Sequence, residues 1–178
     1  MTALHHIGYW IDDLQEGVAR AIRDLGIGPF LVHEHITFDS WDTDPSVAVA
    51  PGPIRFDHTA AFAAWGPVVI ELGQVHDIDP ALAAAYQVAP GAVSHVSWVV
   101  DDLAVEAERL VALGCRPINT ARTWPIHVSW HTGGSLFPHP IEVHEANPAI
   151  LGMHPRLAAL AAGWDGSDPM RPMRPPTP

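Results

Sequence analysis

Two nine-residue segments of this chain are similar to each other, and this repeat constrains the fold more than any other feature. Residues 6–14 read HIGYWIDDL and residues 95–103 read HVSWVVDDL. The similarity continues in each copy with a Leu-Gly pair and a following proline, within residues 25–29 and 113–117. Two matches in nearly the same register predict that the chain consists of two copies of one structural unit.

Each copy has the pattern of a strand, a helix and further strands. Runs rich in β-branched residues predict a first strand over residues 4–11 and over residues 93–100. The acidic pairs at 12–13 and 101–102 suit helix N-caps, and the apolar spacing after them predicts an amphipathic helix in each copy. Four later segments are strand-like: residues 54–64, 68–75, 124–132 and 140–145. The repeated unit is therefore predicted as β-α-β-β-β.

The repeat divides the chain into three parts. Residues 1–88 are predicted to form the first module, with a long loop at 33–53, and residues 89–145 the second module. Residues 146–178 are predicted as a C-terminal helix and an extended, Pro-rich tail. The loop is rich in Asp, Pro and His, and we expect either a lid over a pocket or a plain surface excursion.

Charge and composition exclude several classes of protein. Twenty acidic residues outweigh nine basic ones, all of which are arginine, and the net charge is −11. The absence of lysine excludes lysine Schiff-base chemistry, and the lack of clustered cations argues against nucleic-acid binding. No apolar run approaches the ~20 residues that cross a bilayer, and the single Cys115 cannot form an internal disulfide. We expect a cytoplasmic protein that binds neither nucleic acid nor membranes.

Two histidines and two glutamates occupy matching places in the two copies. His6 and His95 lie in the first strand of each unit, and Glu71 and Glu142 each follow an isoleucine in the last strand. A carboxylate within an apolar strand is costly unless it is paired or metal-bound. Two units packed together would bring these four side chains to one place. Such a donor set suits a divalent cation and leaves two octahedral positions for substrate oxygens.

Neighbouring residues leave alternatives open. His5 precedes His6 and, by strand alternation, points to the opposite face, so we favour His6 as the ligand because it matches His95 in the repeat. His144 follows Glu142 by two residues and is predicted to point the same way, as an orienting residue or as an acid or base. The seven tryptophans could line a bulky apolar cavity, but we expect most of them to belong to the core.

The two H-x-x-x-x-x-D-D-L segments and the two Ile-Glu strands resemble the vicinal oxygen chelate superfamily, which includes glyoxalase I and methylmalonyl-CoA epimerase. The resemblance covers about residues 4–145. It implies an α+β fold in which two βαβββ modules form incurved mixed sheets around a shared metal cleft, followed by a C-terminal helix and a Pro-rich tail. In that family each module gives one ligand from its first strand and one from its last. The implied metal ligands are His6, Glu71, His95 and Glu142.

The resemblance also implies an enzyme. We expect a divalent-metal-dependent isomerase, epimerase or lyase that stabilises an enolate or enediolate of a small-molecule carbonyl or thioester substrate, which would be fairly bulky and apolar. The metal would be Ni, Co, Zn, Mn or Fe, the proton would be moved by Glu71, Glu142 or His144, and a homodimer is a further expectation. A ring-cleaving, extradiol-type dioxygenase is one alternative, although a fourth ligand at Glu71 argues against it. The other is a non-catalytic small-molecule-binding protein like the bleomycin-resistance proteins, which carry no metal.

Overall fold

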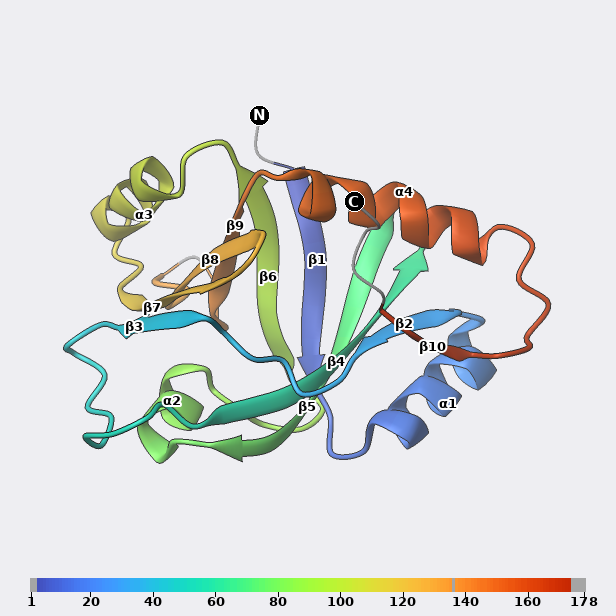
Figure 1. Ribbon diagram of the computed structural model, residues 1–178, viewed down its shortest axis with the longest axis horizontal. Helices are drawn as coiled ribbons and strands as arrows, with labels where there is room; N and C mark the ends of the chain where they lie inside the picture. Colours follow the sequence, from blue (N-terminus) through green and yellow to red (C-terminus); the bar gives the residue numbers. More distant parts are fainter. Residues whose placement is uncertain (1–2, 136, 174–178) are drawn as a thin grey trace.

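The computed structural model describes residues 3–135 and 137–173 and has a mixed α+β fold (Figure 1). The strands are β1 (Ala3–Trp10), β2 (Phe30–His33), β3 (Ser40–Thr43), β4 (Phe56–Trp65), β5 (Val68–Ile78), β6 (Val93–Val100), β7 (Pro117–Thr123), β8 (Ile126–His131), β9 (Ile141–Glu145) and β10 (Met170–Pro172). The helices are α1 (Leu14–Leu25), α2 (Pro80–Ala85), α3 (Leu103–Ala112) and α4 (Pro148–Ala161). No helix in the described ranges is long and apolar enough to span a membrane.

All ten strands belong to one curled sheet, and its two halves repeat the same order. The order is β10-β2-β4-β5-β1-β6-β9-β8-β7-β3, so each half places its first strand at the centre beside its last. The first and last strands pair in parallel in both halves, β1 with β5 and β6 with β9. An antiparallel pairing of β1 with β6 joins the halves. The two βαβββ modules predicted from the repeat are confirmed, and they share a continuous sheet.

The acidic pairs start the two repeated helices as predicted. The Asp13 carboxylate accepts a hydrogen bond from the backbone N–H of Glu16 at 2.9 Å, and the Asp102 carboxylate accepts one from Val105 at 3.0 Å. These bonds satisfy backbone donors that the first helical turn cannot pair. Helix α1 ends at Leu25 and is capped by Gly26, whose φ of 65° is a left-handed conformation that glycine adopts without strain.

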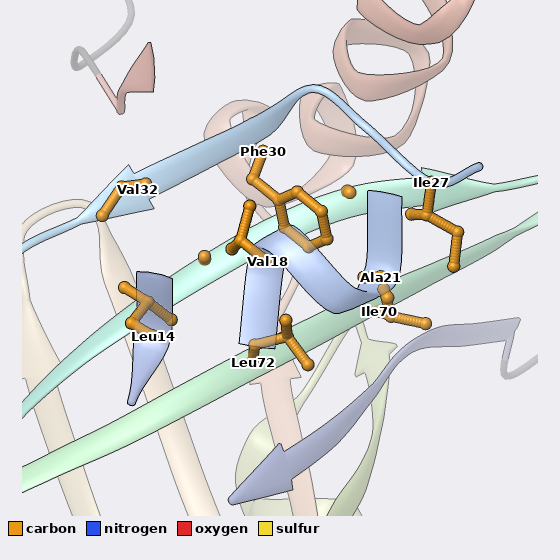
Figure 2. Packing of buried hydrophobic residues seen from close by; sticks show 10 residues of the cluster. Leu14, Val18, Ala21, Ile27, Phe30, Val32, Ile70 and Leu72 are labelled. Carbon is orange, nitrogen blue, oxygen red and sulfur yellow. The ribbon is translucent and has the colours of Figure 1, made fainter. Parts of the chain in front are cut away.

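The buried stripe of α1 packs on one face of the sheet (Figure 2). The core there is formed by Leu14, Val18, Ala21, Ile27, Phe30, Val32, Ala61, Ala63, Ile70 and Leu72. Helix α4 does not pack on this core. Its Leu157 clusters with Val69 of β5, whereas the next residue of β5, Ile70, belongs to the core beneath α1. Since side chains alternate along β5, α1 and α4 cover opposite faces of the sheet. Helix α4 therefore lies on the face that also carries Glu71.

Residues 34–55, which we call the strap, cross from one half of the molecule to the other. They leave the first half after β2, and within them β3 pairs antiparallel with β7 of the second half. Figure 1 shows this segment reaching the far edge of the sheet before the chain returns to β4. The sequence predicted a loop over residues 33–53, and this was wrong for β3. The short, half-exposed segment has little strand character of its own and gains its hydrogen bonds by pairing with a distant edge.

The strap covers apolar surface, and the tail adds another strand. Phe38, Trp41 and Val47 of the strap pack on a cluster that includes Tyr86 and Trp130, so the strap is not a plain surface excursion. The tail was predicted to be extended, and part of it is β10, which pairs in parallel with β2. Residues 174–178 of the tail lie outside the described residues.

The cap assignment separates the two members of each acidic pair. Asp13→Ala should lower the free energy of unfolding by about 1 kcal/mol, because an N–H of the first helical turn loses its acceptor. The neighbouring Asp12→Ala should change it by less than about 0.5 kcal/mol, since Asp12 is not the cap. Urea unfolding of both variants measures the difference, and equal losses would contradict the assignment.

Candidate metal centre

The four residues predicted as ligands lie on the four adjacent strands at the centre of the sheet. Glu71 is on β5, His6 on β1, His95 on β6 and Glu142 on β9, in that spatial order. All four are buried, with exposed fractions between 1% for His95 and 8% for Glu142. The pairing of β1 with β6 is what brings the two halves of the set together.

The donor atoms of these side chains are close to one another. Nε2 of His6 is 2.8 Å from Nε2 of His95. Oε2 of Glu71 lies 2.9 Å and 3.3 Å from these two nitrogens, and Oε2 of Glu142 lies 3.1 Å and 3.5 Å from them. Ligands about 2.1 Å from one ion and at right angles to each other lie about 3 Å apart. The four side chains could therefore hold a single divalent cation.

The charges of the cluster call for a positive group among them. Burial alone would lower the pKa of His6, but hydrogen bonds to Glu142 and Glu71 raise it to about 9. Burial would raise the pKa of Glu71, yet the charge of His95 and the hydrogen bond from His6 hold it below its ordinary value. The pKa of Glu142 is likewise held well below its ordinary value, by the nearby His144 and His95. Two ionised carboxylates thus require a positive charge, which either a proton or a cation can supply.

Each candidate histidine ligand has a supporting residue behind it, and a β-bulge places that residue there. The pairing of β1 with β6 shifts register twice, and the extra residues are His5 in β1 and Ser94 in β6. Each extra residue directly precedes a candidate ligand, His6 or His95. Strand alternation predicted His5 on the face opposite to His6, and this was wrong, because the bulge brings the two ring centroids to 5.0 Å.

Hydrogen bonds from these supporting residues orient both imidazole rings. Burial lowers the pKa of His5 to about 3, so its ring is neutral near pH 7. Its Nε2–H donates to the backbone carbonyl of Ile150 at 3.2 Å, which leaves Nδ1 to accept from Nδ1–H of His6 at 2.8 Å. In the second half, Oγ of Ser94 lies 2.7 Å from Nδ1 of His95. Both Nε2 atoms are thereby directed into the cluster.

His144 lies beside the cluster, on the side that the sequence predicted. Its Nε2 is 2.9 Å from the same Oε2 of Glu142 that faces the candidate histidine ligands. His144 also forms a second potential donor group with His5 and His6, within 4.8 Å. Both nitrogens of His5 already have partners, so this second group is the poorer cation site.

An aromatic wall, which the sequence analysis did not identify, extends from the centre towards the strap. Trp130 contacts His95 with ring centroids 4.6 Å apart, Tyr86 contacts Trp130 at 4.8 Å, and Phe56 contacts Tyr86 at 5.2 Å. His58 stacks on Phe56 at 4.3 Å. Alternation of Phe56 and His58 along one strand was the available signal, but only the tertiary pairing places both beside the centre.

Some buried polar atoms near this wall have no hydrogen-bond partner among the described residues. They include Nε1 of Trp10, Nδ1 of His58 and Nδ2 of Asn119. The oxygen of the Asn119 side chain does have a partner, because it accepts a hydrogen bond from the hydroxyl of Tyr86. An indole N–H and an amide NH2 can only donate, so this region offers donors to an oxygen-bearing ligand.

The sequence of this chain matches the family model described as the Glyoxalase/Bleomycin resistance protein/Dioxygenase superfamily, over residues 5–128. The chain belongs to this superfamily. This membership confirms the resemblance to the vicinal oxygen chelate proteins. The match includes His6, Glu71 and His95 and ends before Glu142 and helix α4. A comparison with curated protein sequences gives no significant match.

Solved structures of three proteins share the fold. A hypothetical protein from Bacillus halodurans C-125 is 17% identical with a TM-score of 0.53, over 82% of this chain and 95% of that one. Methylmalonyl-CoA epimerase from Mycobacterium tuberculosis is 15% identical with a TM-score of 0.50, over 84% and 91%. A mutant of 4-hydroxymandelate synthase from Streptomyces coelicolor is 17% identical with a TM-score of 0.50, over 85% of this chain and 43% of that one. At these identities the likeness shows the fold alone.

Another buried histidine, His131, lies away from the cluster. It follows Trp130 on β8 and therefore faces the other side of the sheet, where its Nε2 is 2.7 Å from Oγ of Ser129. Burial lowers the pKa of His131 from its ordinary value of 6.5. The unfolded chain takes up a proton here near pH 6.5, whereas the folded protein does so only at lower pH. The stability that depends on the neutral ring is complete above pH 6.5 and is lost as the pH falls below it.

This linkage predicts a pH-dependent stability with a defined source. In the presence of a chelator, the free energy of unfolding should fall between pH 7 and pH 5, and His131→Gln should reduce that slope by up to about 1.4 kcal/mol per pH unit. Denaturant unfolding at several pH values measures the slope. The exposed His76→Gln serves as a control. An unchanged slope in His131→Gln would show that other groups carry the dependence.

Proposed function

We propose that this protein is a divalent-metal-dependent enzyme of the isomerase, epimerase or lyase type that moves a proton at a carbon next to a carbonyl. The observation that carries the proposal is the buried cluster in which Nε2 of His6 and Nε2 of His95 lie 2.8 Å apart, and each lies 2.9–3.5 Å from one oxygen of Glu71 and one of Glu142. Four such donors on four neighbouring strands, each histidine supported from behind, suit cation binding better than a structural salt bridge.

In this proposal His6, Glu71, His95 and Glu142 hold Ni, Co, Zn, Mn or Fe. The two carboxylates neutralise a divalent charge, and the nitrogen and oxygen donors suit all of these ions. When bound, the cation supplies the Lewis acidity that stabilises negative charge developing on a substrate carbonyl oxygen. His5 and Ser94 keep both imidazoles in the orientation that directs Nε2 inward.

The two carboxylates differ in how firmly they are held, which favours Glu71 as the proton-transferring base. Oε2 of Glu142 has three imidazole neighbours, His6, His95 and His144. Oε2 of Glu71 has only two of these contacts, to His6 and His95. Because His144 restrains Glu142, Glu71 is freer to rotate towards a substrate C–H and take its proton. His144 is then a positioning residue for Glu142.

The aromatic wall favours a bulky and apolar substrate that carries acceptor oxygens. Phe56, Tyr86 and Trp130 supply flat apolar surface beside the centre, and Trp10 and Asn119 supply unpaired donors. The strap covers this wall with Phe38 and Trp41 and would act as a lid, excluding water while the proton is transferred. These apolar surfaces and donors favour a carbonyl compound or thioester with an apolar body.

Proton exchange tests the proposed reaction. The metal-loaded protein, incubated in deuterated water with carbonyl and thioester compounds that include methylmalonyl-CoA, should exchange the proton next to the carbonyl without consuming oxygen. Glu71→Gln should lower the exchange rate by about 100-fold or more, because the base is lost. NMR of the compounds and an oxygen electrode provide the measurements.

A matched control uses a carboxylate outside the cluster. Glu145 lies on β9 like Glu142 but pairs with His127 at 3.0 Å, so Glu145→Gln should keep the activity. Oxygen uptake matched to turnover would instead support a ring-cleaving dioxygenase. Tight binding of a planar ligand by protein that takes up no metal would support a binding protein. Either result would overturn the isomerase proposal.

Two serines on one strand test the support of the second candidate ligand. Ser94 contacts Nδ1 of His95, whereas Oγ of Ser97 is buried without a partner among the described residues. Ser94→Ala should weaken metal binding by about 10- to 100-fold, as expected when a residue that orients a ligand is removed. Ser97→Ala should leave the affinity unchanged. Competition with a chelator of known affinity measures the metal affinity of both variants. Equal affinities would show that Ser94 does not support metal binding by His95.

A further inference from the structure

A separate group of donor side chains lies at the base of the strap, outside the candidate metal centre. His35, Asp57 and His76 offer donor atoms that all lie within 4.8 Å of one another. Nδ1 of His35 is 2.9 Å and 3.0 Å from the two oxygens of Asp57, and the rings of His35 and His76 have centroids 4.8 Å apart. We propose that this group binds a divalent transition-metal ion such as Zn2+, and that the bound ion fastens the strap.

The backbone at this place directs the side chains towards one another. The register between β4 and β5 shifts by one residue between Asp57 and His58, which makes His76 the extra residue of a β-bulge. Bulges change the direction of a side chain and are frequent beside functional sites. His35 has a φ of 47°, a left-handed conformation that is uncommon for residues other than glycine. Two local departures from regular backbone thus converge on Asp57.

Thr59 holds both histidines of the group. Its Oγ1 accepts a hydrogen bond from the backbone N–H of His35 at 3.2 Å and lies 2.8 Å from Nε2 of His76. With Nε2 engaged, Nδ1 of His76 is the nitrogen available to a cation. Arg55, two residues before Asp57, carries a positive charge that would oppose cation binding. Its guanidinium pairs with Asp77 at 2.9 Å, which neutralises that charge.

Two imidazoles and one carboxylate are a donor set used by zinc sites that keep further positions for water. The side chains of His35 and Asp57 are 66% and 44% exposed, so an ion can reach them without opening the fold. Their nitrogen and carboxylate donors favour a borderline transition metal over the harder Ca2+ or Mg2+.

The position of the group gives the ion a structural consequence. His35 lies at the beginning of the strap, and Asp57 is the second residue after its end. A bound ion would therefore close the loop at its base and reduce the conformational freedom of the residues between. Phe38 and Trp41, which cover the aromatic wall, belong to that loop. Zinc at the strap base would thus slow the opening of the strap over the candidate metal centre.

Zinc titration of four proteins tests this proposal. Full-length protein without an affinity tag, freed of metal with a chelator, is titrated with zinc sulfate by calorimetry, and hydrogen exchange of residues 36–43 is followed with and without zinc. The variants are His76→Ala, His6→Ala and the control His127→Ala. His127 is matched because its Nδ1 also lies 3.0 Å from a carboxylate, Glu145, without belonging to a three-donor group among the described residues.

We expect His76→Ala to bind one zinc equivalent fewer than the wild type and His127→Ala to bind the full number. Zinc should slow exchange of the strap in the wild type and in His6→Ala, but not in His76→Ala. Asp57→Asn, nearly the same in shape, should lose the same equivalent if His76→Ala folds poorly.

Equal zinc binding by the wild type and His76→Ala would overturn the site, as would an equal loss in His127→Ala. Zinc binding that leaves exchange unchanged would overturn the fastening of the strap. The two proposed sites are distinguished by the count. A wild type that binds a single equivalent, lost in His76→Ala and kept in His6→Ala, would support the strap site and contradict the central metal centre.

Discussion

The structure depends on the need to keep two carboxylates and two imidazoles in contact inside an apolar sheet. Ionised groups this deeply buried are tolerated only when opposite charge and hydrogen bonds compensate for their lost hydration. The antiparallel pairing of β1 with β6 meets that need by placing His6 and His95 at the junction of the two halves. The close approach of the two strands also requires a glycine opposite His95. A Cβ on Gly8 would lie 2.2 Å from Cε1 of His95, so only glycine leaves space for the ring.

Support for the centre comes from outside the repeat as well as from within it. His5 donates to the carbonyl of Ile150, and His154 bonds to the backbone oxygen of His5, so α4 contacts the first half through two hydrogen bonds. The second half uses a serine hydroxyl of its own strand for the corresponding task. The two halves thus reach the same ring orientation by different chemistry, and α4, which has no counterpart in the repeat, is part of the candidate site.

The fold and the candidate ligands were accessible from the sequence because the repeat relates positions that lie far apart in the chain. His6 with His95, and Glu71 with Glu142, could be matched without knowing the structure, and their proximity follows from two similar units packing together. Features created by pairing between unrelated segments were not accessible. Neither the register shift that turns His5 towards His6 nor the pairing of β3 with β7 is encoded by local periodicity.

The strap and the tail determine how the sheet ends. Each half, taken by itself, would finish in a bare strand, β2 in one and β7 in the other, with backbone groups free to pair with other molecules. Each edge is instead covered by a strand that arrives from a distant part of the chain, β10 on β2 and β3 on β7. The new outer strands are short, and β10 carries Pro172, which lacks a backbone donor. Either module expressed by itself would lose this cover. Joining both modules in one chain therefore also protects the sheet from edge-to-edge aggregation.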